Sequence, residues 1–261
     1  TSPFAFTGNK FEFRMVGSSQ SVAAVNTMLN AIMAEEYDQM AAKLDAGESL
    51  DDIIREFFKD HERIIFNGDG YSDEWKDEAA RRGLTNICHV PEAIMKFNDP
   101  QSRSVLIGEK IFNENELNCR IEVELEKFTK KVQIESRVLG DLAINHIVPT
   151  AVIYQNRLLE NLRGLKEIFS TEEYEEMTAD RKDLVREIQR RILSIKKAVH
   201  DMTEARKVAN HLGSQVEKAF SYEEKVRPYL EEIREHIDSL ELEIDDEIWP
   251  LPKYRELLFT K

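Results

Sequence analysis

The chain opens with TSPFAFTGNKFEFRMVGSSQS (residues 1–21), the stretch that decides how the rest of the sequence is interpreted. From Lys10 to Met15, charged and apolar residues alternate strictly, and the apolar Val16 follows. Successive side chains of a β-strand point to opposite faces of a sheet, so this alternation predicts a strand over residues 10–16. One face of that strand is apolar, and the other carries a cation, an anion and a cation.

The charged face consists of Lys10, Glu12 and Arg14. A carboxylate between two cations on a rigid strand could ligate a hard divalent metal, while the cations take phosphate or carboxylate oxygens. A solvated sheet face with ion pairs between neighbouring strands is the other interpretation. Spacing alone favours this second one, because any half-buried strand alternates in the same way.

A single strand leaves its backbone donors and acceptors without partners. We therefore expect another copy of the chain, or a preceding segment, to supply the neighbouring strand. The chain also begins at Thr1, within what the pattern makes a sheet, and we interpret it as a fragment of a longer protein.

Composition limits the classes of function. The 261 residues are 41% hydrophobic and 33% charged, with a formal net charge of -14. Nucleic acids and anionic membranes would be repelled by that charge, so neither is expected as a partner. No apolar run approaches the roughly 20 residues of a spanning helix. Cys88 and Cys119 show no CxxC spacing, which is typical of reduced thiols in a cytoplasmic protein.

Helical periodicity dominates after residue 19. It predicts helices over 19–45 and 50–65, then long amphipathic helices over 110–247 that would form an antiparallel bundle. Pro149 should kink or break the first long helix, and Pro228 should lie near a helix start. The predicted fold class is therefore mainly α, with one or few strands followed by a long helical bundle. The closing residues 248–261 suggest a tail docked on a surface.

Ser-x-x-Glu patterns mark expected helix starts at Ser170 and at Ser221. The loop around Asp69 and Asp73 is rich in oxygen atoms, but it lacks the spacing of an EF-hand. A turn followed by a helix that Ser72 caps is the favoured interpretation of this loop. The six histidines show no metal-ligand spacing.

Taken together, SPFAFT, GNKFEFRMVGSSQS, FNGDGYSDEW and the closing DDEIWPLPKYRELLF resemble the C-terminal part of the type III glutamine synthetases. The resemblance covers essentially all 261 residues. It implies that residues 1–109 are the C-terminal end of the family's catalytic α/β domain. Residues 110–247 would be a helical extension, and residues 248–261 a tail docked on the enzyme.

The resemblance also implies an activity, namely ATP-dependent ligation of ammonia to glutamate through a γ-glutamyl phosphate, with Mg²⁺ or Mn²⁺. By the same resemblance Glu12 would ligate the metal that bridges to the nucleotide phosphates. Arg14 would contact glutamate or the transferring phosphoryl group, and both Arg14 and Lys10 would help to bind ATP. Lys10 stands where other branches carry Arg, so charge is retained without bidentate geometry.

The family's other ligands would lie before Thr1, so we expect this chain alone to be inactive. The resemblance further implies assembly into a large ring-based homo-oligomer. An alternative of another class is an acidic helical scaffold or oligomerisation module, whose charged strand is incidental and whose apolar stripes bind partner helices.

Overall fold

The computed structural model describes residues 4–14, 17 and 20–259. The chain is mainly α-helical, as predicted, with one two-stranded sheet among the described residues. It divides into two compact units, Thr1–Ile121 and Glu122–Lys261. The boundaries 1–109, 110–247 and 248–261 stay a prediction.

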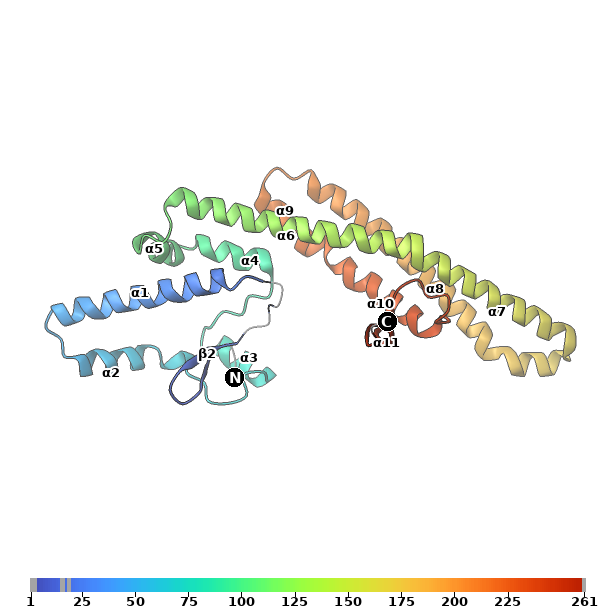
Figure 1. The fold of residues 1–261 in the computed structure, drawn as a ribbon, viewed down its shortest axis with the longest axis horizontal. Helices are drawn as coiled ribbons and strands as arrows, with labels where there is room; N and C mark the ends of the chain where they lie inside the picture. The colour runs from blue at the N-terminus through green and yellow to red at the C-terminus, as the bar shows by residue number, and fades with distance from the viewer. Residues whose placement is uncertain (1–3, 15–16, 18–19, 260–261) are drawn as a thin grey trace. The chain divides into compact units, whose positions relative to one another are not determined.

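The first unit starts with a β-hairpin (Figure 1). Strand β1, Phe4–Phe6, pairs antiparallel with strand β2, Phe11–Phe13, so that Ala5 lies opposite Glu12. The turn between the strands is closed by the Thr7 amide, which donates to the Lys10 carbonyl at 2.9 Å, and Gly8 adopts the positive φ of 98° that this turn requires. The partner strand thus comes from the chain itself, contrary to our expectation of another copy or segment. Strand β2 is shorter than the predicted 10–16, of which residues 15 and 16 lie outside the described part.

Helices make up the rest of the first unit. They are α1 (Ala23–Asp45), α2 (Leu50–Asp60), the 3₁₀ turn η1 (Glu62–Ile64), α3 (Asp73–Arg81), α4 (Val90–Met95), the 3₁₀ turn η2 (Lys96–Asn98) and α5 (Pro100–Gly108). Helix α1 ends before Gly47, whose φ is 91°, and the Ser49 hydroxyl caps α2 by accepting from the Asp52 amide. The helix predicted over 50–65 is divided at His61, where the α-helix gives way to the 3₁₀ turn.

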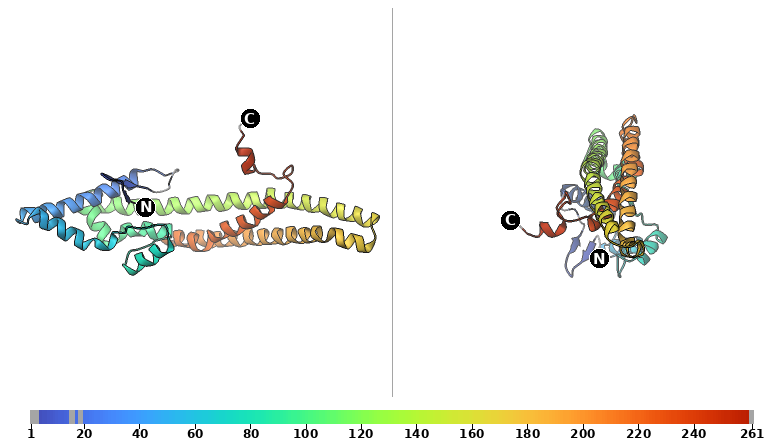
Figure 2. Two further views of the ribbon diagram at one scale, coloured as in Figure 1. Left: turned by 90° about the horizontal axis from the view of Figure 1, so that it is seen from below. Right: turned by 90° about the vertical axis from the view of Figure 1, so that its right-hand side faces the viewer.

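The second unit is built from long helices, and the first of them, α6 (Glu114–Leu142), already begins in the first unit. The others are the π-helix η3 (Ala143–Ile147), α7 (Val148–Ile168), α8 (Thr171–Asn210), α9 (Gln215–Ser221), the π-helix η4 (Tyr222–Val226), α10 (Pro228–Glu243) and α11 (Tyr254–Leu257). Helix α8 packs against α7 and against α10 (Figure 2). Short connections reverse the chain on both sides of α8, which produces the predicted antiparallel arrangement.

Pro149 and Pro228 each follow a π-turn. Proline has no amide hydrogen, and its ring clashes with the carbonyl four residues earlier. Before Pro149 the Val148 amide bonds the Ala143 carbonyl, and before Pro228 the Arg227 amide bonds the Tyr222 carbonyl, five residues back in each case. The wider turn relieves the clash while the helix continues. The helical path therefore continues through Pro149 without a break, so of the two predicted outcomes only the kink stays a prediction. Pro228 does start a new α-helix, as predicted.

The core of the second unit lies between its helices. Its fully buried side chains include Ile188, Ile195 and Met202 of α8 and Ile233 and Leu240 of α10. After α10 the chain stays attached, because Trp249 is buried in this core and the Lys253 ammonium donates to the Glu241 carbonyl at 2.7 Å. No described helix combines the length and the apolar character needed to cross a lipid bilayer.

Side-chain hydrogen bonds cap the starts of α8 and α9. Ser170 and Glu173 form the predicted capping box at the start of α8. The prediction that Ser221 starts the next helix is wrong, because Ser221 is the buried last residue of α9. The capping box of α9 is instead formed by Ser214 and Glu217.

Candidate functional site

The structure brings the three predicted site residues together at the end of the hairpin. Glu12 lies in strand β2, with Lys10 just before the strand and Arg14 just after it. Residues two apart along an extended chain point to the same side, and these three side chains meet. The Arg14 Nη2 atom lies 2.6 Å from Glu12 Oε2, and the Lys10 Nζ atom lies 3.6 Å from Glu12 Oε1. Each carboxylate oxygen of Glu12 therefore faces its own cation.

These cations keep Glu12 ionised. The hydrogen bond from Arg14 is the largest cause that holds the pKa of Glu12 below its usual value, and Thr7 and Lys10 contribute in the same direction. About a third of the Glu12 side chain is exposed to solvent, so an incoming ligand can reach it. The charged face is thus an accessible group of three side chains on strand β2 and the residues that flank it.

Glu12 can hold a divalent metal only together with further ligands. Mg²⁺ and Mn²⁺ prefer several hard oxygen ligands, and an ionised carboxylate is one of them. Within the described part of the chain, no group of three or more His, Cys, Asp or Glu residues is placed to hold a metal ion. Glu12 could therefore be one metal ligand, and the others would have to come from outside the described residues.

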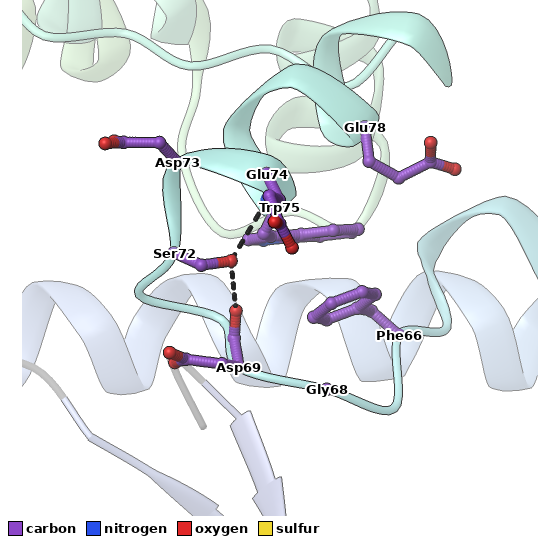
Figure 3. A pocket seen from close by; sticks show the side chains of 8 residues that line it. All are labelled: Phe66, Gly68, Asp69, Ser72, Asp73, Glu74, Trp75 and Glu78. Carbon is purple, nitrogen blue, oxygen red and sulfur yellow. Dashed lines mark hydrogen bonds between the residues drawn. The ribbon is translucent and has the colours of Figure 1, made fainter.

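The oxygen-rich loop before α3 lines a pocket of its own (Figure 3). Ser72 caps α3, because its hydroxyl accepts from the Trp75 amide, and the same hydroxyl donates to the Asp69 carbonyl at 3.0 Å. The Asp69 carboxylate accepts from the Tyr71 amide at 3.0 Å. These contacts confirm the predicted turn and helix cap.

An aromatic pair lies on the other side of this pocket. The Phe66 and Trp75 rings are stacked with centroids 4.0 Å apart. A Cβ atom at Gly68 would lie only 2.6 Å from the Phe66 ring, so a larger residue there would require this ring to shift. The Arg82 guanidinium lies over the Trp75 ring and also donates to the Ile65 carbonyl at 2.9 Å. The chain's own Arg82 therefore already lies over the Trp75 ring. These contacts attach the loop to α3.

Comparison with known proteins shows which family this chain resembles. Residues 49–166 match the sequence profile of the glutamine synthetase C-terminal domain. This match, together with the relatives described next, confirms the resemblance to the C-terminal part of the glutamine synthetases found in the sequence.

Three relatives show how similar the chain is to individual glutamine synthetases. The chain is 67% identical to a glutamine synthetase of Bacteroides fragilis (strain YCH46) and 31% identical to the type-3 glutamine synthetase of Dictyostelium discoideum. It is 30% identical to a glutamine synthetase of Butyrivibrio fibrisolvens. Each match covers 100% of this chain, including the hairpin, but only 36% or 37% of the relative. The chain thus spans little more than a third of the length of these relatives.

Proposed function

We propose that this chain is part of an ATP-dependent glutamate–ammonia ligase and that its β-hairpin contributes Lys10, Glu12 and Arg14 to the active site. The observation that carries the proposal is the assembled charged face, in which both oxygens of Glu12 meet a cation. The glutamine synthetase relatives, whose matches include the hairpin, support the same assignment.

Each residue has a role that its chemistry supports. Glu12 is a ligand for Mg²⁺ or Mn²⁺, which would neutralise the charge of the ATP phosphates. Arg14 presents a planar guanidinium suited to two oxygens of a carboxylate or phosphoryl group, so we assign it to glutamate or the transferring phosphoryl group and to ATP. Lys10 provides a point charge for ATP. A metal ion held by Glu12 would compete with Arg14 for the same carboxylate and would weaken this ion pair.

The proposal extends to assembly and location. Because the described residues supply one metal ligand at this site, the remaining ligands would come from other segments, and the isolated chain is expected to be inactive. We propose that the complete enzyme forms a large ring-based homo-oligomer, acts in the cytoplasm, and takes glutamate and ammonia as substrates.

A chimera provides the test. This chain would replace the matching part of the Bacteroides fragilis relative, to which it is 67% identical, and Glu12→Ala would be introduced into it. We expect glutamine formation to fall by about 100-fold or more, because phosphoryl transfer depends on charge neutralisation by the metal. Steady-state assays across a range of Mg²⁺ concentrations would measure the loss.

The control is Glu48→Ala, which makes the same change at an exposed acid between α1 and α2. Both variants should elute from a sizing column like the parent chimera. If Glu12→Ala kept activity within a few-fold of the parent, Glu12 would not be a metal ligand. The rival interpretation, an acidic scaffold without catalysis, would then be favoured.

A further inference from the structure

The second unit carries a pair of arginines that the ligase proposal does not use. Their placement follows from the register of two antiparallel helices, α6 and α8. The Gln133 side-chain amide of α6 donates to the Asn210 side-chain oxygen of α8 at 3.2 Å. Two turns further along, a Cβ atom at Gly140 of α6 would lie 3.5 Å from Val199 of α8.

Arg137 and Arg206 lie between these two contacts. Arg137 follows Gln133 by four residues, and Arg206 precedes Asn210 by four residues. Because the helices are antiparallel, both steps lead one turn in the same direction, so the two arginines face each other across the helix pair. Their like charges repel in the absence of a partner.

Among the described residues, no carboxylate forms an ion pair with Arg137 or Arg206, and no acidic group is among the causes that shift the pKa of Arg206. The neighbours of Arg206 three and four positions away are Met202, Thr203, Ala209 and Asn210, none of which is acidic. Arg137 has one acidic neighbour at such a distance, Asp141, whose carboxylate accepts from the Asn145 amide at 2.6 Å. Elsewhere on α8 the arginines are paired, for example Arg186 with Asp183 and Arg190 with Glu187.

The surroundings of the pair are polar and partly buried. The Tyr222 ring is fully buried, and its hydroxyl donates to Asn210 at 2.8 Å and accepts from Gln133 at 3.1 Å. Burial and the charge of Arg137 both lower the pKa of Arg206, while burial raises the pKa of Tyr222 against the opposing effect of both arginines. The register of α6 and α8 and these pKa shifts agree in placing both guanidinium groups near the Tyr222 hydroxyl.

We propose that Arg137 and Arg206 form a binding site for a phosphate group, bordered by the Tyr222, Asn210 and Gln133 hydrogen-bond network. Two guanidinium groups present forked donors that match the several oxygens of a phosphate dianion better than the two oxygens of a carboxylate. Such a ligand would remove the repulsion between the arginines and would connect α6 to α8. The inference concerns a surface of the helical unit and does not depend on the ligase activity.

Thermal unfolding and calorimetry on the full chain can test this site. Inorganic phosphate and methyl phosphate would be titrated at constant ionic strength, with chloride as the reference anion. We expect the melting temperature of the parent to rise with phosphate, and the affinity to fall at least ten-fold in Arg137→Gln and in Arg206→Gln. Binding of both probes would indicate a phosphate carried on a larger molecule, and binding of inorganic phosphate alone would indicate the free ion.

The matched control is Arg186→Gln, which removes an arginine of α8 that has its own acidic partner and should leave phosphate binding unchanged. Arg137 is exposed, so its variant remains informative if Arg206→Gln fails to fold. The proposal is overturned if neither probe acts beyond chloride or if both variants bind phosphate like the parent. It is also overturned if the variants change the oligomeric state and leave phosphate binding intact, since the arginines would then meet a carboxylate of another copy.

Discussion

Glu243, near the end of α10, shows how a single side chain can work against the fold. Its Oε2 atom is buried, and none of the described residues donates a hydrogen bond to it. Burial is the main cause that raises the pKa of Glu243, and Glu187 adds to it, while Arg191 and Arg190 oppose the shift. The folded state therefore favours the protonated form of this carboxyl group more than the unfolded state does.

The pH dependence follows from the direction of that shift. A pKa raised in the folded state contributes stability that is present below the unfolded value and is lost as the pH rises through the folded value. Glu243→Gln removes the ionisation, so we expect a higher melting temperature than the parent at pH 7. The gain should disappear as the pH falls below the ordinary carboxyl pKa of 4.5. Melting curves between pH 4 and 7, with the exposed Glu232→Gln as control, would measure it; a gain that is equal at all pH values would contradict the assignment.

At the scale of the elements, two Ser-x-x-Glu patterns compete for one helix start. They are Ser214 to Glu217 and Ser221 to Glu224, and the structure uses the first as a capping box. The Ser221 hydroxyl is buried and makes no hydrogen bond within the described part of the chain. One serine therefore stabilises the helix and the other does not.

A pair of alanine substitutions separates these roles. Ser214→Ala should lower the free energy of unfolding by about 1 kcal/mol, because it leaves amide groups at the start of α9 without an acceptor. Ser221→Ala removes a buried hydroxyl without a partner, so it should be neutral or slightly stabilising. Chemical denaturation of both variants would check this. A larger loss at Ser221 than at Ser214 would show that the second pattern, and not the first, caps a helix.

These elements also show what can be predicted from sequence. The long helices follow from a regular apolar period, and the grouping of Lys10, Glu12 and Arg14 follows from the two-residue period of a strand. Strand β1 was missed because three residues are too short to show a period. The π-turns could not be foreseen either, because a proline alone does not reveal whether a helix ends or widens. The pair of Arg137 and Arg206 depends on the register between distant helices, which no local pattern encodes.

At the scale of the whole molecule, the buried apolar side chains are distributed unevenly. The large buried cluster, which runs from Val132 to Trp249, belongs to the second unit. In the first unit, the described helices α1 and α2 leave apolar side chains such as Ile32, Met33 and Phe58 exposed. Apolar burial is the main stabilising contribution to a folded unit, so the second unit should resist local unfolding better.

Limited proteolysis tests this difference. A protease of broad specificity, such as thermolysin, should cut first in the first unit, for instance in the exposed connection at residues 84–89. A fragment that contains residues 122–261 should accumulate and keep its helical circular dichroism. Mass spectrometry of the early fragments would identify the cut sites, and early cuts between residues 171 and 240 would contradict the expectation.

The π-turns before Pro149 and Pro228 indicate where insertions and deletions can occur along the long helices. A π-turn accommodates one residue more than an α-helical turn, and in a regular helix each added residue rotates everything beyond it by about 100°. A wide turn confines that rotation to a few residues, so the apolar stripes on either side keep facing their neighbours. Insertions and deletions among relatives should therefore be tolerated at these two points and selected against elsewhere along the long helices.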